Sequence, residues 1–357
     1  MPTIDVFTHV LPRAYERALE RSQANLGARH PSVRENLLTD MDMRLVANPP
    51  RSLQIVGSVI FDEQIREKYR AEVAQTANQE LSQLVLDHPE LFEGAIAHLP
   101  LNDLEFSCHY LADTIARSDT LVGIQMLTHE DGRNFADEQN SALFSMLNEV
   151  RRPVWLHPVA EHSSPHFLES ARQQLLATVR DLMDLRWAAS YPRVRVILHG
   201  GVAALFAQGE VSAEATRLAA QQNFVVDTAW ANSLEITTAV KTLGAGRVLF
   251  SSDSPFATET GVESLDVAQH ALEQVKAAHI DEQEKQLVLS GSWEHMRARI
   301  PVNVLSEQDL YEEEKAQAKA EKAKKEAEED EKLQAEIDAE QKKNADRDDS
   351  NGLSASF

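Results

Sequence analysis

The sequence has few features of a secreted, membrane-spanning or disulfide-stabilised protein. Its 357 residues include one cysteine, Cys108, so no disulfide can form within the chain. There is no run of 18 or more apolar residues, and the first residues lack the basic and then apolar pattern of a signal peptide. We therefore expect a cytoplasmic protein without a membrane partner.

Positive charge is also scarce. The chain has 35 Lys and Arg residues against 57 Asp and Glu residues, which gives a formal net charge of -22. Sequence-independent binding to nucleic acid or to an anionic membrane needs a surplus of Lys and Arg, because these residues neutralise phosphates. We expect no nucleic-acid partner. The hydrophobic content of 43% is that of an ordinary globular protein and allows a large core.

The composition changes near residue 306. Residues 307–349 include 17 acidic and 9 basic residues, a local charge of -8, and their large aliphatic side chains after Leu310 are Leu333 and Ile337. Two such side chains cannot form the seam of a coiled coil. We predict a barrel domain over residues 1–303 and a charged, low-complexity tail over 304–357. The tail is expected to be a solvated helix or disordered, and to act as a spacer.

Eight short β-branched or apolar runs recur in the first 255 residues, and helical patterns separate most of them. Near-continuous apolar runs such as VRVIL are typical of strands buried on both faces, as in a parallel sheet. Eight such β-α units match the size of one (β/α)₈ TIM barrel, a fold of the α/β class, and the strand count disfavours a doubly wound open sheet. The predicted strands are residues 4–9, 53–60, 92–100, 121–127, 153–158, 194–201, 224–230 and 247–255.

Four of these predicted strands end at a residue type that binds metals or transfers protons. They are the first, fifth, sixth and eighth strands, which end at His9, His157, His199 and Asp253. In a barrel the carboxyl ends of the strands surround a shared mouth. Imidazole nitrogen and carboxylate oxygen are also the ligands that Zn²⁺ prefers. The sequence therefore predicts one site at this mouth.

Further side chains could line the mouth. His98 lies near the end of the third predicted strand, and Trp230 at the end of the seventh could stack on an aromatic substrate. His129 is either a pocket residue or an ordinary loop residue. The pair Gly200 and Gly201 predicts a tight turn from strand to helix. Two histidines of the EHSSPH loop are expected to be solvated: His162 and His166.

The segments around these residues resemble the amidohydrolase superfamily. IDVFTHVLPRAY, TDMDMRL, WLHP, VILHGG and FSSDSP are similar, in order and spacing, to motifs of the family that includes aminocarboxymuconate semialdehyde decarboxylase and aromatic-acid decarboxylases. The resemblance covers roughly residues 3–300. It implies that His9, His157 and Asp253 bind a zinc or manganese ion and that His199 transfers a proton. It also implies a small carboxylic acid substrate and a homodimer.

Phe7 departs from the family pattern, which has a His or Glu at this position. Residues 7 and 9 of a strand share one face, so we expect Phe7 to face the same mouth as His9 and to contact the substrate. Phenylalanine offers a metal no lone pair. The three other ligands still meet the usual minimum of a catalytic zinc site, in which water takes the remaining position.

Three functions are compatible with these residues. The first is a metal-assisted enzyme, for which we expect a carboxy-lyase acting on a small aromatic or unsaturated carboxylic acid. A hydrolase of an ester, lactone or amide, in which Asp253 accepts a proton from water, is its alternative. The second is a metal-free lyase or hydratase in which His199 and Asp253 perform acid–base catalysis. The third is a catalytically silent barrel that acts as a binding protein.

Overall fold

The computed structural model describes residues 3–22, 36–60, 65–130, 132–159, 166–256 and 262–300. All of these residues belong to one compact unit, Met1–Asn303. The predicted charged tail lies outside the described residues, so its conformation and its boundary stay predictions.

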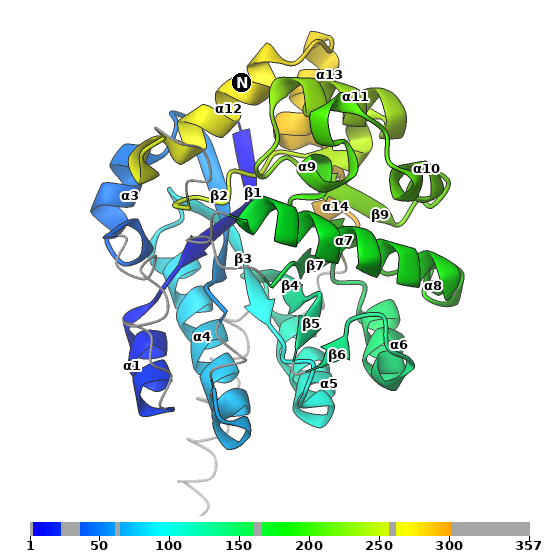
Figure 1. Ribbon diagram of the computed structural model, residues 1–357. Helices are drawn as coiled ribbons and strands as arrows, with labels where there is room; N and C mark the ends of the chain where they lie inside the picture. Colours follow the sequence, from blue (N-terminus) through cyan, green and yellow to red (C-terminus); the bar gives the residue numbers. More distant parts are fainter. Residues whose placement is uncertain are drawn as a thin grey trace, which may run out of the picture. The chain divides into compact units, whose positions relative to one another are not determined.

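Eight parallel strands form a barrel in the order β1, β2, β3, β4, β7, β8, β9 and β10. The ring is closed by backbone hydrogen bonds from Val6 N to Phe250 O, 2.9 Å, and from His9 N to Ser254 O, 2.8 Å. The fold prediction is therefore confirmed (Figure 1). The strands are β1 (Thr3–Val10), β2 (Ser52–Ser58), β3 (Phe92–His98), β4 (Leu121–Leu127), β7 (Val154–His157), β8 (Val196–Leu198), β9 (Phe224–Asp227) and β10 (Val248–Leu249).

Helices surround the strands, as Figure 1 shows for α4, α5 and α7. Several begin at residues that cap free backbone N–H groups: Asp103 accepts from Phe106 N before α5, and Asn232 takes part in a capping box before α11. A small hairpin, β5 (His129–Glu130) and β6 (Arg133–Asn134), follows β4. The helices are α1 (Arg13–Arg21), α3 (Met41–Ala47), α4 (Glu67–Asp87), α5 (Leu104–Asp113), α6 (Ser141–Val150), α7 (Phe167–Asp184), α8 (Trp187–Ser190), α9 (Gly201–Leu205), α10 (Ala213–Ala219), α11 (Ser233–Leu243), α12 (Val267–Ala277), α13 (Glu282–Gln286) and α14 (Ser292–Arg297).

The strands alternate between two hydrophobic cores. Trp155 and Ile197 belong to the cluster inside the barrel, whereas Leu156 belongs to the larger cluster between strands and helices. Because side chains alternate with a period of two, His157 and His199 follow Trp155 and Ile197 onto the inner face. The barrel therefore directs apolar residues to its interior and places the polar ones where the strands end.

Two of the last barrel strands are much shorter than predicted. The strand predicted for 194–201 spans Val196–Leu198, and the one predicted for 247–255 ends at Leu249. The chain turns through left-handed backbone conformations soon afterwards, with φ of 70° at Gly200 and 61° at Asp253. Such a conformation breaks the extended geometry of a strand. These turns lie beside His199 and at Asp253, two of the predicted site residues.

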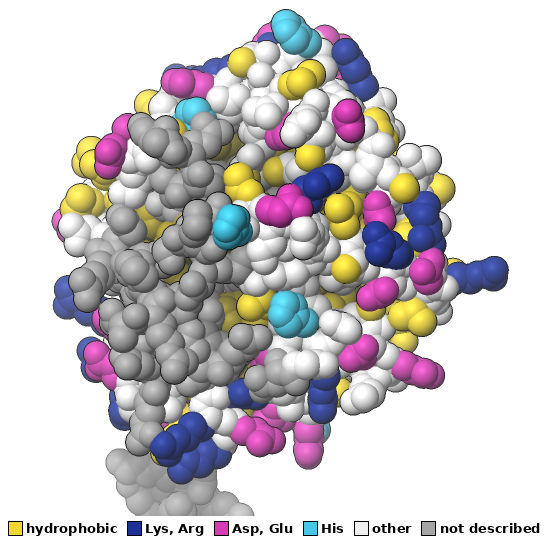
Figure 2. Space-filling view, viewed as in Figure 1, with side chains coloured by type: hydrophobic (Ala, Val, Ile, Leu, Met, Phe, Trp, Pro, Cys, Tyr) yellow, Lys and Arg dark blue, Asp and Glu magenta, His cyan; other side chains and the backbone are white. Residues whose placement is uncertain are grey.

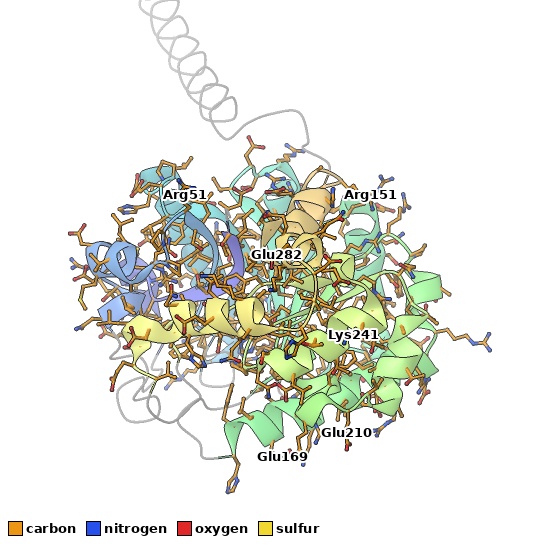
Figure 3. All side chains as sticks on the ribbon, turned by 90° about the horizontal axis from the view of Figure 1, so that it is seen from above. Arg51, Arg151, Glu169, Glu210, Lys241 and Glu282 are labelled. Atoms are coloured by element: carbon orange, nitrogen blue, oxygen red, sulfur yellow. The ribbon has the colours of Figure 1, made fainter. Side chains whose placement is uncertain are left out.

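Charged side chains of both signs are interspersed among the described residues on the face shown in Figure 2. Figure 3 shows Glu169 and Glu210 near the periphery of the described part of the chain. Within the described ranges, no helix combines the length and the apolar character needed to cross a bilayer.

Candidate active site

Four of the predicted site residues converge at the carboxyl ends of the barrel strands. One ligand atom each from His9, His157, His199 and Asp253 lies within 4.8 Å of the others, and all four residues are buried. His9 and His157 belong to β1 and β7, while His199 and Asp253 follow β8 and β10. Closure of the barrel brings together residues that are up to 244 positions apart.

Asp253 is the centre of this group. Its Oδ1 lies 2.9 Å from His9 Nε2 and 3.2 Å from His199 Nε2, and its Oδ2 accepts a 2.8 Å hydrogen bond from Trp230 Nε1. Its backbone N donates to Phe7 O at 3.2 Å, which connects the turn after β10 to β1. Both carboxylate oxygens therefore already have partners.

Asp227 was not predicted from the sequence. Its Oδ2 lies 2.8 Å from His199 Nδ1, while its Oδ1 accepts from Gly200 N at 2.7 Å and from Ala229 N at 3.1 Å. The available signal was an acidic residue inside the otherwise apolar run FVVD, at an inward position of β9. Because the backbone donors fix its carboxylate, Asp227 sets the orientation of the imidazole.

His199 therefore lies between two carboxylates. Burial alone would lower the pKa of His199, but the carboxylates of Asp227 and Asp253 raise this pKa to about 10. The two carboxylates therefore favour the protonated form of the imidazole. In this arrangement His199 can donate a proton.

Two further buried charged groups fix the backbone around the site. Asp5 accepts hydrogen bonds from both the backbone N and the hydroxyl of Ser252, the residue before Asp253. Burial raises the pKa of Asp5 to about 7, although these hydrogen bonds oppose the shift. Arg44 Nη1 donates to His9 O at 2.8 Å. The sequence resemblance included the segment that holds Arg44 but did not indicate this role.

Phe7 lies among the imidazoles. Its ring centroid is 4.2 Å from that of His199, 4.8 Å from His9 and 5.5 Å from His157. The side chain is fully buried. Phe7 therefore provides an apolar surface where a fourth ligand would otherwise lie, and its contact with substrate stays a prediction.

Trp230 and Gly200 are packed tightly against each other. A Cβ atom at Gly200 would lie 2.1 Å from Cζ3 of Trp230, and the positive φ of Gly200 adds backbone strain for any other residue. The predicted tight turn is thus where a glycine is required. The indole of Trp230 also packs edge-on against His199, with centroids 4.9 Å apart. Its hydrogen bond to Asp253 was not predicted, and substrate stacking stays a prediction.

Three other candidate histidines, His98, His129 and His166, lie outside the convergent group. His98 is buried at the end of β3, where Asn78 of α4 donates to its carbonyl and accepts from its backbone N. His129 begins β5, and His166 precedes α7. His162 is outside the described residues. A role for His98 in substrate binding stays a prediction.

The group fits a divalent cation. Two ligands bound to one ion at about 2.0–2.2 Å must approach each other to roughly 3 Å, and the 2.9 Å between His9 Nε2 and Asp253 Oδ1 meets this requirement. The two imidazoles of His9 and His157 and the carboxylate of Asp253 are a donor set suited to zinc or manganese. His9, His157 and Asp253 would serve as ligands, with His199 beside them.

Introducing a ligand with Phe7→His tests this geometry. The new imidazole would enter the space beside three existing donors, so metal affinity is expected to rise by about tenfold, or about 1.4 kcal/mol. Competition against a chromophoric chelator measures this affinity. Phe7→Leu is the matched control, because it removes the ring without adding a donor. Equal affinities of Phe7→His and Phe7→Leu would show that position 7 does not reach the ion.

The profile of the amidohydrolase family matches residues 4–291. No curated protein matches the chain significantly. Among solved structures, 5-carboxyvanillate decarboxylase from Sphingomonas paucimobilis is similar, with 12% identity and a TM-score of 0.63 over 84% of this chain and 99% of that one.

Two other similar structures are decarboxylases of dihydroxybenzoic acids. The 2,6-dihydroxybenzoate decarboxylase from Rhizobium has 18% identity and a TM-score of 0.62 over 84% of this chain and 99% of that one. The enzyme from Polaromonas sp. JS666, solved with manganese and the inhibitor 2-nitroresorcinol, has 17% identity and a TM-score of 0.63 over 83% and 97%. At these identities the likeness demonstrates a shared fold.

Proposed function

The chain belongs to the amidohydrolase family, and from that membership we propose that it is a metal-assisted carboxy-lyase acting on a small aromatic or unsaturated carboxylic acid. The observation that carries the proposal is the position of His199, whose Nδ1 lies 2.8 Å from Asp227 Oδ2 and whose Nε2 lies 3.2 Å from Asp253 Oδ1. Decarboxylation needs a proton donor beside the substrate. The similar decarboxylases support the same chemistry.

His9, His157 and Asp253 would hold the divalent ion, whose chemistry is to polarise an oxygen of the substrate as a Lewis acid. His199 delivers the proton from Nε2 to the carbon that bears the carboxylate. The bond from that carbon to the carboxylate then breaks, and carbon dioxide leaves. The electron pair of the broken bond restores the double bond that protonation of the carbon had interrupted, and a proton from the solvent returns to His199. Phe7 and Trp230 form apolar surface that excludes competing water.

The hydrolase alternative is less compatible with this site. Hydrolysis would require Asp253 to accept a proton from attacking water. Its Oδ1 instead faces His9 and His199, and its Oδ2 accepts from Trp230. A carboxylate with these partners is better placed as a ligand and an anchor than as a base. The homodimer and the cytoplasmic location stay predictions.

A panel of substrates tests the proposal. We expect the purified protein to release carbon dioxide from at least one member of a series of hydroxybenzoates and muconate-like acids. Chelation should abolish this activity, and either Zn²⁺ or Mn²⁺ should restore it. The measurements are carbon dioxide release, loss of the acid by chromatography, and elemental analysis of the protein before and after chelation.

The same assay includes esters, lactones and amides of related acids. Hydrolysis of these compounds without carbon dioxide release from any acid would replace the carboxy-lyase with a hydrolase. Protein that carries no metal and turns over neither class would instead be a binding protein. If decarboxylation continues after complete metal removal, the carboxy-lyase reaction is supported but metal assistance is contradicted.

A further inference from the structure

A cleft of about 370 Å³ lies at the end of the barrel opposite the candidate active site. It is formed by the segments that precede β7, β8, β9 and β10 and by the end of α14. Figure 3 shows one of its residues, Arg151, at the edge of the molecule. Five arginines line the cleft: Arg151, Arg193, Arg195, Arg247 and Arg299.

Among the described residues that line this cleft, none has an acidic side chain. Within the described part of the chain, none of the five arginines forms an ion pair with a carboxylate, whereas Arg180 and Arg217 on the outer helices pair with Glu214 and Asp184. The cleft therefore concentrates positive charge in a chain whose net charge is -22.

The backbone holds two of these guanidinium groups in place. Arg195 donates from Nη1 to the carbonyl of Gln222. Arg247 is largely buried and donates to four backbone carbonyls around the end of α10 and the start of β9, those of Leu218, Ala219, Gln221 and Phe224. These guanidinium groups are therefore fixed at the wall of the cleft.

The arginines also repel one another. Burial lowers the pKa of Arg195, and the neighbouring Arg299 lowers it further. Burial and the charge of Arg195 lower the pKa of Arg247 in the same way. An anion between these groups would remove the repulsion, and the planar guanidinium matches the oxygens of a phosphate in two-point contacts.

We propose that this cleft binds a small oligophosphate, such as the di- or triphosphate group of a nucleotide. Arg193 and Arg299 are exposed and would contact the phosphate oxygens, while the fixed Arg195 supplies charge at the wall. Pro153 and Met296 add apolar surface to the cleft. An organic group attached to the phosphates would pack against this surface. The negative net charge disfavours long polyanions, which contact much of a surface, but not a small ligand within one cleft.

Calorimetric titration of the full-length protein with pyrophosphate, triphosphate and ATP tests the proposal, with citrate as a polycarboxylate comparator. We expect saturable binding with one ligand per chain. ATP binding more tightly than triphosphate would identify a nucleotide as the ligand, and equal affinities would identify the free oligophosphate. Stronger binding of citrate than of any phosphate, or no saturable binding of a phosphate, would overturn the proposal.

Charge-reversal variants distinguish oligophosphate binding in the cleft from nonspecific electrostatic attraction to the protein surface. The double variant Arg193→Glu with Arg299→Glu is expected to weaken oligophosphate binding by about tenfold or more, because each lost contact is a charge-assisted hydrogen bond. The control is Arg13→Glu with Arg17→Glu on exposed positions of α1, which changes the net charge equally and should alter affinity by less than about twofold. Equal losses in both double variants would contradict a site in the cleft. The readout does not depend on catalytic activity, so it is independent of the proposed carboxy-lyase.

Discussion

Replacing His199 with asparagine is expected to lower kcat for decarboxylation by about 10²–10⁴-fold, the range by which a positioned acid or base accelerates proton transfer. The amide nitrogen of the new side chain would take the place of imidazole Nδ1 and could still donate to Asp227. The buried carboxylate would thus keep a partner while the acidic proton at Nε2 is lost. Steady-state kinetics on the preferred acid measure the effect. Undiminished turnover would rule out His199 as the proton donor.

Asp227→Asn is expected to lower kcat less than His199→Asn does and to shift the pH dependence of kcat. It keeps the shape of the side chain but removes one of the two charges that raise the pKa of His199 to about 10. We expect kcat to fall by about 10–100-fold, the usual cost of losing a group that orients a reacting histidine at a metal site, with little change in KM. The acid form of His199 would also be lost at lower pH, so the alkaline decline of kcat should move toward neutrality. Asp87→Asn on the exposed end of α4 is the control.

Asp253→Asn is expected to remove most of the bound metal and about 10³-fold of the activity. Lewis-acid polarisation contributes several kcal/mol to a transition state, and each 1.36 kcal/mol is a factor of ten in rate. The fold should persist, because asparagine tolerates the left-handed conformation that Asp253 adopts, with φ of 61°. Elemental analysis and carbon dioxide release on the same preparation measure both effects.

Asp266→Asn, at an exposed position before α12, is the matched control for Asp253→Asn and should leave metal content and activity unchanged. Thermal unfolding of both variants checks that the barrel is intact. If Asp253→Asn retains full metal occupancy but loses activity, Asp253 is not a metal ligand and acts on the substrate instead. Wild-type activity in the variant would contradict both roles.

The barrel could be predicted because its pattern is local. Continuous apolar runs such as that of β8 are sufficient to identify strands buried on both faces, and helices follow from the segments between them. The convergence of His9, His157, His199 and Asp253 required one more step, that strand ends meet at one mouth. The ends of the strands were less predictable, since the turns at Gly200 and Asp253 depend on φ values that no apolar pattern encodes.

The partners of the site residues could not be predicted in this way. Asp227 and Trp230 each contact a residue on a neighbouring barrel segment, and their sequence positions alone do not indicate which side chain they meet. Asp5 was visible as a charge inside an apolar strand, yet its contact with Ser252 exists only because the last strand closes against the first. Contacts across the barrel closure are set by the three-dimensional register.

The close packing of Gly200 against Trp230 also constrains how this site can evolve. Any larger residue at position 200 requires the indole to move, and moving the indole takes the Nε1 donor away from Asp253. A single substitution at position 200 or 230 therefore disturbs the hydrogen bond between Trp230 and the carboxylate of Asp253. At these two positions the wall of the pocket can therefore diversify through paired substitutions, which narrows the mutational routes to a new substrate.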